Sequence, residues 1–384
     1  MGQASIRAGL VALIFFQSVS TYKLVCYFTN WSQYRQQGGR FVPESIDANL
    51  CTHIIYAFAN VSSGQINRAE WNDDTTYEPL NHLKTINPHL KILLSAGGYG
   101  EGSKPFSKIA ASPVRRLNFV NSVVRYLREN SFDGFDLDWV SPEEGDKKRL
   151  VNLVKDLSTQ FKREGAKGSN EKLILSVAVQ AGREAIDKGY DIKAISESAD
   201  FINFLSYDFH GSWEDATGHG SPLYKGKNDF GSSSYYNVDY SVKYLKRKGA
   251  AAEKIMMGIP TFGRTFTLAS RHTGVGAMVS GPGTPGAITR EAGMLSYYEI
   301  CEFNHGAKKE RIDEQAVPYS HKGNQWVGYE DITSVRGKVQ YMKANNLGGI
   351  MIWALDLDDF SGSACNEGNY PLTAVVKEEL NKKN

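Results

Sequence analysis

The sequence predicts an α/β protein that folds as a TIM barrel, a closed (β/α)8 barrel, with a small α+β insertion between its seventh and eighth strands. Eight apolar runs bounded by turn residues follow one another along the chain. Most of these runs lack polar alternation, which is typical of strands that are buried on both faces. Segments with helical spacing and charge separate several of the runs. Strands that alternate with helices in this way predict a parallel barrel surrounded by helices.

The expected elements can be placed in order along the chain. Helical spacing is clearest over Val114–Asn130, Lys147–Gly165 and Val335–Asn345. The gap between the last two strands is the longest, holds several glycine and proline turns, and exceeds the length of one barrel loop. We therefore expect residues 264–337 to form the insertion within a barrel domain of residues 22–384. The eight expected strands are Leu24–Phe28, His53–Ala59, Ile92–Ser95, Phe132–Trp139, Leu173–Val179, Phe201–Tyr207, Ile255–Thr261 and Gly349–Leu355.

The N-terminal segment differs from the rest of the chain. Arg7 precedes an apolar run from Ala8 to Phe16, and small residues follow as far as Thr21. This pattern is typical of a secretory signal peptide, because the run is too short and wrongly flanked for a membrane anchor. We expect residues 1–21 to be removed and the mature protein to be secreted into the extracellular space. No later segment has the length of a membrane span, so we expect no membrane insertion.

The composition limits the partners that the chain can have. It has 384 residues, of which 41% are hydrophobic, and a formal net charge of +2. So small a net charge does not require nucleic acid or an anionic membrane as a partner, and we expect neither. We also expect no cofactor and no metal, because the four cysteines do not have metal-ligand spacing.

The cysteines form an even set in an exported chain, which predicts two disulfides. Three pairings are possible. Cys26 and Cys51 lie at the first two expected strands, whereas Cys301 and Cys365 flank the last one. We therefore favour the pairs Cys26–Cys51 and Cys301–Cys365.

Two N-glycosylation motifs begin at Asn30 and Asn60. The residues after Asn60, Ser62 to Gly64, predict an exposed loop, so Asn60 is the better candidate. Asn30 adjoins an aromatic residue that we expect to bind ligand, which argues against its modification.

One strand has an acidic face. The segment Phe132–Val140 reads Phe-Asp-Gly-Phe-Asp-Leu-Asp-Trp-Val, and alternation puts Asp136, Asp138 and Val140 on one side. Two carboxylates so close together cost free energy unless one is neutral or strongly hydrogen-bonded, which favours a functional origin. Glycosidic cleavage needs an acid that protonates the leaving oxygen, and valine has no ionisable proton. We therefore expect a degenerate site that binds sugar without cleaving it.

Informative side chains gather at the carboxyl ends of the expected strands, where parallel barrels have their sites. Aromatic, acidic and amide groups together suit a sugar polymer. Pyranose rings stack on aromatic rings, and their polar groups need hydrogen-bond partners. The residues are Asn30 and Trp31, the turn Ser95–Tyr99, Tyr207–Gly211, Trp213, Arg264, Trp353 and Asp356.

Several of these features also have plain structural explanations. Trp353 is as consistent with filling the barrel as with binding a sugar, and Gly97 with Gly98 first predicts a tight turn. Asp133 fits a capping role as well as a functional one. His210 has no serine or cysteine nucleophile arranged around it, so we expect no catalytic triad.

The motifs together resemble glycoside hydrolase family 18, and within it the chitinase-like lectins of vertebrates. The family signature is Asp-Gly-x-Asp-x-Asp-x-Glu. This sequence matches its positions from Asp133 to Asp138 but has Val140 in place of the acid. The resemblance covers nearly all of the chain after residue 21. The stretches that carry it are Tyr22–Phe28, Ser95–Gly98, Asp133–Trp139, Tyr207–Gly211, Gly258–Thr267, Asn324–Tyr329 and Met351–Phe360.

The resemblance implies a mechanism that this chain retains only in part. Active members use the acetamido oxygen of the substrate as the nucleophile, steadied by the aspartate that matches Asp138. Tyr207 resembles the tyrosine that hydrogen-bonds the acetamido group, and Trp353 resembles the indole floor under the central sugar. The two glutamates beyond Pro142 would have to fold back to replace the missing acid. We expect no catalytic residue and chitooligosaccharide partners, with carbohydrate contacts from Tyr27, Trp31, Phe58, Gly97, Tyr99, Asp138, Tyr207, Asp208, Trp213, Arg264 and Trp353.

Three departures from the family pattern lie in the expected cleft. Tyr99 stands where the family usually has tryptophan, Gly100 where close relatives have asparagine, and Ser141 where they have tyrosine. Each change removes stacking area or a hydrogen bond, so we expect weaker affinity, above all for short oligomers. No cysteine-rich binding segment follows Leu380, so we do not expect processive attack on solid chitin.

Two alternatives remain open. A different acid could sustain weak or residual glycosidase activity. The resemblance also implies a signalling or matrix protein whose surface contacts a receptor or a glycosaminoglycan. The basic candidates are Lys147, Lys148, Arg149, Lys246, Arg247, Lys248, Lys382 and Lys383, although the first three also fit a solvated helix start.

Overall fold

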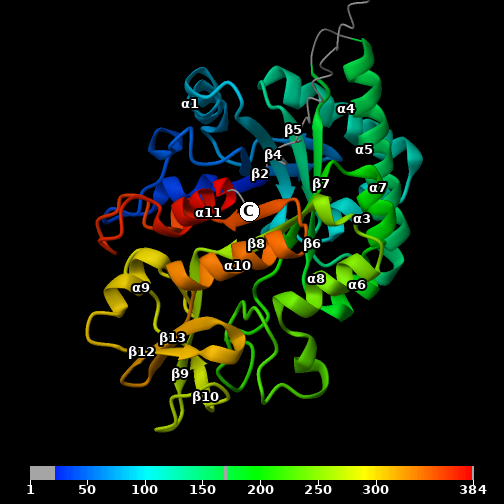
Figure 1. Ribbon diagram of the computed structural model, residues 1–384. Helices are drawn as coiled ribbons and strands as arrows, with labels where there is room; N and C mark the ends of the chain where they lie inside the picture. The colour runs from blue at the N-terminus through cyan, green and yellow to red at the C-terminus, as the bar shows by residue number, and fades with distance from the viewer. Residues whose placement is uncertain (1–21, 168–170, 383–384) are drawn as a thin grey trace, which may run out of the picture.

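The computed structural model describes residues 22–167 and 171–382, and its centre is a closed parallel barrel (Figure 1). The strand order is β1-β15-β8-β7-β6-β5-β4-β2, and β1 also pairs with β2, which closes the ring. This arrangement confirms the predicted TIM barrel. The barrel strands are β1 Lys23–Thr29, β2 His53–Ser62, β4 Lys91–Gly97, β5 Gly134–Asp138, β6 Ile174–Gln180, β7 Phe201–Leu205, β8 Ile255–Pro260 and β15 Gly349–Trp353.

Alternation along the barrel strands separates two apolar layers. On β5, Phe135 and Leu137 belong to the large core beneath the helices, whereas Asp136 and Asp138 point into the barrel. Tyr27 of β1 belongs to the smaller inner cluster and contacts Asp136. The strand faces thus follow the predicted alternation.

Helices surround the barrel, as the sequence predicts. In α4, Pro113 occupies the first turn, where its missing N–H costs nothing, and Phe119, Val123 and Leu127 form a buried stripe. The α-helices are α1 Asp73–Ile86, α2 Gly98–Glu101, α3 Lys104–Ala110, α4 Pro113–Glu129, α5 Lys147–Lys167, α6 Arg183–Gly189, α7 Ile192–Ser198, α8 Val238–Arg247, α9 Tyr297–Phe303, α10 Ile332–Ala344 and α11 Pro371–Asn381. Short 3-10 helices are η1 Asn30–Tyr34, η2 Pro43–Ser45, η3 Glu144–Asp146, η4 Gly231–Tyr235, η5 Ala252–Lys254, η6 Asp313–Gln315 and η7 Leu355–Leu357.

A second, antiparallel sheet lies beside the barrel and follows β8 in the chain; it is yellow to orange in Figure 1. Its order is β10-β9-β14-β13-β12, with β11 paired to β9. Together with α9 it is the insertion between the seventh and eighth barrel strands. Its strands are β9 Phe262–Leu268, β10 Val279–Pro282, β11 Met294–Ser296, β12 Lys308–Ile312, β13 Val317–Lys322 and β14 Gln325–Gly328.

Two disulfides join the cysteines in the favoured pairs. Cys26 and Cys51 link the first barrel strand to the start of the second, with Cα atoms 6.2 Å apart. Cys301 of α9 and Cys365 link the insertion to the segment after β15, with Cα atoms 5.1 Å apart. The second bridge therefore ties the insertion to the barrel.

The end of β2 differs from its prediction. Asn60 was expected in an exposed loop, but it lies within β2 and pairs with Asn67 of the short strand β3, Gln65–Asn67. The polar run Ser62-Ser63-Gly64 forms the tight turn of this hairpin rather than a longer loop. Asn60 is nevertheless exposed, so its glycosylation stays a prediction.

The described residues contain no helix with the length and hydrophobicity that a membrane crossing requires. The predicted signal peptide, residues 1–21, lies outside the described residues.

Candidate functional site

A cleft of about 710 Å³ opens at the carboxyl ends of the barrel strands. Residues that are distant in the sequence meet there, because parallel strands end at one rim of a barrel. The cleft brings together many of the residues singled out from the sequence, among them Asn30, Trp31, Phe58, Gly97, Gly98, Tyr99, Gly100, Asp138, Val140, Tyr207, Asp208, Arg264, Trp353 and Asp356.

Aromatic side chains form the floor of the cleft. The ring of Phe58 lies 6.0 Å from the rings of both Trp31 and Trp353, measured between centroids. Trp353 is only partly buried, so its ring is available to a ligand as well as filling the barrel mouth. Tyr99 stands above this floor with 70% of its surface exposed. The arrangement offers flat apolar faces on which pyranose rings can stack.

Tyr27 and Trp213 lie outside the cleft lining. Tyr27 is 0% exposed and packs beneath Trp353, with ring centroids 5.0 Å apart, so it supports the floor without offering a surface to a ligand. Trp213 is 60% exposed and stands over the guanidinium of Arg264, which lies 5.4 Å from its ring. The sequence predicted direct sugar contacts for both residues, and neither contributes to the cavity wall in this arrangement.

Two glycines allow close approach of the strands at the cleft. Gly97 has φ of 121°, and a Cβ atom there would lie 1.9 Å from the carbonyl oxygen of Asp138. A Cβ atom on Gly98, with φ of 75°, would lie 2.6 Å from the ring of Phe58. The glycines are therefore required by the backbone turn, and they leave room for Asp138 and Phe58.

The two aspartates of β5 have different surroundings. Asp136 accepts hydrogen bonds from Ser176 at 2.6 Å, Ser95 at 2.7 Å, Tyr27 at 2.8 Å and Asn203 at 3.0 Å. Burial raises the pKa of Asp136, and these four donors oppose that shift.

Asp138 lines the cleft and has no comparable set of donors. Burial raises the pKa of its carboxyl well above the usual range, and the nearby charge of Asp136 raises it further. Asp138 is therefore the member of the pair that holds a proton. In that form it can donate a hydrogen bond to a ligand.

Val140 is the next inward-pointing residue after Asp138. It is 4% exposed, and its isopropyl group contributes to the cleft lining. The chain then turns away at Ser141, which has φ of 50°, and Glu143 and Glu144 are exposed to solvent outside the cavity. Neither glutamate folds back to replace an acid at Val140.

Two other acidic groups of the cleft, Asp208 and Asp356, already have partners. Asp208 accepts two hydrogen bonds from Arg264, at 2.7 and 2.8 Å. Asp356 pairs with Arg35 at 2.5 Å. Such bidentate or buried pairs hold both side chains in fixed positions.

A hydrogen-bond chain crosses the rim between β5 and β6. Gln180 Oε1 accepts from the backbone N–H of Ser141 at 2.8 Å and from its hydroxyl at 3.1 Å. Gln180 Nε2 donates to the hydroxyl of Tyr99 at 3.0 Å. Gln180 thus orients two positions at which the sequence departs from the family pattern, and no sequence motif pointed to it.

Other residues singled out from the sequence have structural roles. Asp133 accepts from the N–H of Ile92 at 2.7 Å and from Lys84 at 3.1 Å, which is a capping role. Asn30 is 3% exposed and donates to the carbonyl of Phe58 at 3.0 Å, so its amide is not accessible for modification. His210 contacts Glu214 at 2.9 Å, a pair with no nucleophile.

Sequence reasoning missed several cleft residues. Arg35 and Phe262 line the cavity, and Met294 reaches it from the insertion. Arg35 lies in a loop after η1, and Met294 lies more than thirty residues beyond β8, so neither is marked by a strand end. Only the pairing of β11 with β9 places Met294 at the cleft.

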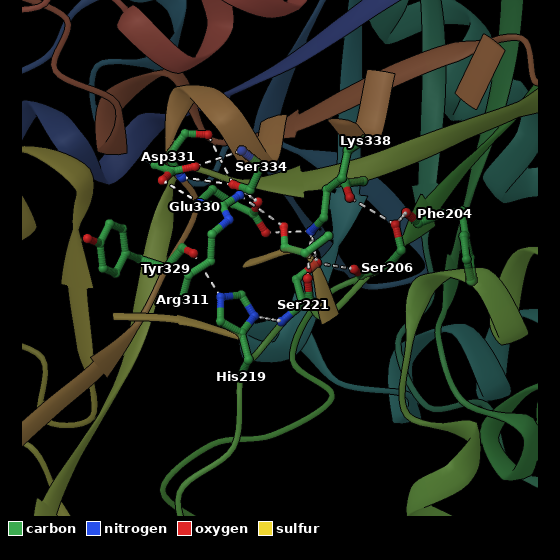
Figure 2. A network of polar contacts seen from close by, with 12 residues as sticks. Phe204, Ser206, His219, Ser221, Arg311, Tyr329, Glu330, Asp331, Ser334 and Lys338 are labelled. Carbon is green, nitrogen blue, oxygen red and sulfur yellow. Dashed lines mark hydrogen bonds and ion pairs between the residues drawn. The ribbon is translucent and has the colours of Figure 1, made fainter. Parts of the chain in front are cut away.

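A buried polar network holds the long loop that follows β7 (Figure 2). Lys338 of α10 pairs with Glu330 and donates to the carbonyl and hydroxyl oxygens of Ser221, at 2.6 and 2.7 Å. The hydroxyl of Ser221 donates to the carbonyl of Ser206 at 2.8 Å, next to Tyr207. The network therefore links the insertion and α10 to the loop that carries Tyr207 and Asp208.

His219 belongs to the same network and has a defined tautomer. Its Nδ1 accepts from the N–H of Ser221 at 3.0 Å, so the N–H at Nε2 donates to the carbonyl of Tyr329 at 2.8 Å. Burial lowers the pKa of His219 to about 3, with a further contribution from Lys338. The ring therefore stays neutral at physiological pH.

The described residues contain no group of three or more side chains that could hold a metal ion.

The family model described as glycosyl hydrolases family 18 matches residues 23–358, which is most of the chain. The chain belongs to glycosyl hydrolase family 18. The family membership confirms the resemblance that the sequence motifs indicated. Of the aspartates in the segment that resembles the family signature, Asp138 lines the cleft of this family 18 protein, and Val140 lines it as well.

Relatives in the family include proteins with different descriptions. Human chitinase-3-like protein 2 is 50% identical over 382 residues, which cover 99% of this chain and 98% of that protein. Mouse chitotriosidase-1 is 46% identical over 387 residues, covering 99% of this chain and 83% of that protein. The solved structure of human YKL-39, described as a pseudo-chitinase with retained chitooligosaccharide binding properties, matches with a TM-score of 0.93 and 51% identity, covering 94% of this chain and 100% of that one.

Proposed function

We propose that this protein is a secreted lectin that binds chitooligosaccharides, the polymers of N-acetylglucosamine, without hydrolysing them. The observation that carries the proposal is Val140. It is the next residue after Asp138 that lines the cleft, just beyond the end of β5, and we assign this position to the proton donor that would act on the glycosidic oxygen. An isopropyl group cannot supply that proton, so the cleft binds the polymer and lacks the acid that cleaves it.

The groups that would hold an amino sugar remain in the cleft. Trp353 offers an aromatic face for the central ring. Burial raises the pKa of the Tyr207 hydroxyl well above its usual range, so it stays a hydrogen-bond donor at any physiological pH. Tyr207 and protonated Asp138 are the two donors that we assign to the acetamido carbonyl.

Similarity to a characterised relative supports the proposal. Human YKL-39, which is described as a pseudo-chitinase that retains chitooligosaccharide binding, is 51% identical in sequence to this chain. Two disulfides and a predicted signal peptide over residues 1–21 support secretion.

Calorimetric titration with N-acetylglucosamine oligomers of increasing length tests the proposal. We expect affinity to rise with length, because each added ring adds stacking area, and Trp353→Ala to weaken binding by about 2 kcal/mol, or about thirtyfold. Phe230→Ala removes an exposed aromatic side chain that does not line the cleft and serves as the control. Equal binding by the native protein and Trp353→Ala would refute the assignment of this cleft.

The same samples separate a lectin from the alternative, a residual glycosidase. The carboxyl of Asp138 is the group that favours this alternative, because burial raises its pKa and it lines the cleft beside Val140. An assay of reducing ends released from a hexamer should stay at the level of the buffer blank. Steady release that Asp138→Asn abolishes would replace the lectin with a slow enzyme.

A further inference from the structure

Gln180 is the last residue of β6 and lies beside the cleft. Alternation along β6 puts its side chain on the same face as Ser176, whose hydroxyl donates to Asp136 inside the barrel at 2.6 Å. Its backbone is paired with Leu205 of β7. A side chain on a paired barrel strand is held more precisely than one in a loop, so Gln180 can orient the residues around it.

The hydrogen bonds of Gln180 have a fixed direction. The backbone N–H of Ser141 can only donate, so the amide group must present its oxygen, Oε1, to Ser141, at a distance of 2.8 Å. The same oxygen accepts from the hydroxyl of Ser141 at 3.1 Å. The amide nitrogen therefore faces the other way, and it donates to the hydroxyl oxygen of Tyr99 at 3.0 Å.

This direction leaves the hydroxyl proton of Tyr99 free. A tyrosine hydroxyl has one proton to donate, and Gln180 occupies a lone pair of its oxygen instead of that proton. Tyr99 lines the cleft. Its proton is therefore available to an acceptor oxygen of a sugar in the cleft.

The position of the Tyr99 ring depends on Gln180. Tyr99 lies between Gly98 and Gly100, which have no side chains to pack against the ring, and 70% of its surface is exposed. In the described part of the chain, Gln180 is the only residue that hydrogen-bonds the Tyr99 hydroxyl. Without this contact the ring would be free to change rotamer, and a ligand would have to immobilise it at a cost in affinity.

We propose that Gln180 is a positioning residue of the chitooligosaccharide site. It holds the ring of Tyr99 at the cleft and directs the hydroxyl proton of Tyr99 to an oxygen of the bound sugar. Gln180 does not itself line the cleft, so it acts through Tyr99 and not by contact with the ligand. This inference rests on the proposed function, because it requires a sugar in the cleft.

Gln180→Glu reverses the hydrogen bond at Tyr99 with little change in shape. A carboxylate still accepts from Ser141, but it also accepts the hydroxyl proton of Tyr99, which is then no longer available to a sugar. Tyr99→Phe removes the same donor by another route. We expect each variant to bind the N-acetylglucosamine hexamer about fivefold more weakly than the native protein, which is the loss expected for one neutral hydrogen bond.

A double variant separates this role from a general disturbance of the rim. If Gln180 acts through Tyr99, then Gln180→Glu should cost no further affinity in a protein that already carries Tyr99→Phe. Gln65→Glu introduces the same charge at an exposed position that does not line the cleft, and it should bind the hexamer as the native protein does. Calorimetry measures the affinities, and urea unfolding of each variant shows that it is folded.

Three results would overturn the proposal. Native affinity in Gln180→Glu would show that the proton of Tyr99 does not reach the sugar. Equal losses from Gln180→Glu with and without the Tyr99 hydroxyl would show that the new charge acts on the ligand directly. Absence of hexamer binding by the native protein would remove the proposed function as well, whereas the first two results would leave it intact.

Discussion

Asp136 and Asp138 are two residues apart on one strand, yet their carboxyl groups have opposite roles. The first accepts four hydrogen bonds and is held rigidly, whereas the second faces the cleft and retains a proton. A pair in which neighbouring carboxyls differ in this way lets one of them donate a hydrogen bond to a neutral ligand.

The proton of Asp138 should make ligand binding depend on pH. Because the pKa of Asp138 is raised in the folded protein, its protonated form persists at pH values above the usual pKa of an aspartate. This hydrogen-bond donor is lost only as the pH rises through the raised pKa. Affinity for chitooligosaccharides should therefore fall with rising pH, and Asp138→Asn, which keeps an N–H donor, should not show this fall. Calorimetry from about pH 4 to about pH 9 measures both profiles.

The same proton also affects stability. At a pH between the ordinary pKa of an aspartate and the raised pKa of Asp138 in the folded protein, the native protein binds more protons than the unfolded chain. The contribution of Asp138 to the free energy of unfolding therefore decreases as the pH rises through this range. Asp138→Asn should remove this part of the pH dependence. If the free energy of unfolding changed with pH in the same way in the native protein and in the variant, another group would be responsible for the pH dependence.

Val140→Glu should restore hydrolysis if the acid is the missing part of the cleft. A positioned acid contributes about 10²- to 10⁴-fold, so we expect release of reducing ends at least about 100-fold above the native background. Val140→Gln has the same length without an acidic proton and should remain inactive. A Val140→Glu protein that binds the oligomer but does not cleave it would show that the cleft lacks more than the acid.

At the residue scale, the sequence predicted the residues that alternate on one strand and missed those joined by side-chain contacts. Asp136, Asp138 and Val140 follow from the period of a strand. Gln180 reaches Tyr99, eighty-one residues away, through one hydrogen bond. No local pattern marks such a contact, because it depends on how α2 and β6 lie relative to each other, which only the fold determines.

At the scale of elements, α10 and the loop after β7 depend on the buried pair of Lys338 and Glu330. Both side chains are 0% exposed, and Ser221 and Ser334 complete their hydrogen bonds. Removal of one partner from a buried pair leaves the other charge uncompensated.

Lys338→Met should therefore lower the free energy of unfolding by about 3–5 kcal/mol. The double variant Lys338→Met with Glu330→Leu removes both charges and should lose less. Urea unfolding measures both values. A double variant that is less stable than the single one would show that the hydrogen bonds, rather than the unpaired charge, determine the stability.

The boundaries of helices and strands were predicted best where the periodic spacing of apolar residues continued over many residues without a break. The expected helix Val114–Asn130 corresponds closely to α4, because its apolar stripe and Pro113 mark both the face and the start. The hairpin of β2 and β3 was missed, since β3 has only three residues and its polar turn resembles an ordinary loop. The misplacement of Asn60 follows from that missed pairing.

At the scale of the whole molecule, the insertion and the barrel are joined by Cys301–Cys365, which closes a segment of 64 residues. Replacing both cysteines with serine should lower the free energy of unfolding by about 4 kcal/mol, because a long loop regains its freedom in the unfolded chain. The pair Cys26–Cys51, with a separation of 25, is the matched control and should cost about 1 kcal/mol less. Denaturant unfolding of both double variants measures the difference, and a larger loss in the control would contradict this account.

The barrel could be predicted as a whole because every strand and helix repeats one local pattern. The second sheet could not be resolved into strands, since β10, β11 and β14 have four, three and four residues and pair across gaps of many residues.

The position of β1 between β15 and β2 has a consequence for biosynthesis. Lys23 of β1 pairs with Gly349 of β15. β1 is the first strand to leave the ribosome, and the edge that pairs with β15 stays uncovered until almost the entire chain has been synthesised. During that interval the nascent sheet exposes an unpaired edge to other chains, and contacts so distant along the sequence form slowly. The ring can be completed only after translation is nearly finished, because the edge of β1 that pairs with β15 stays open until Gly349 has been synthesised.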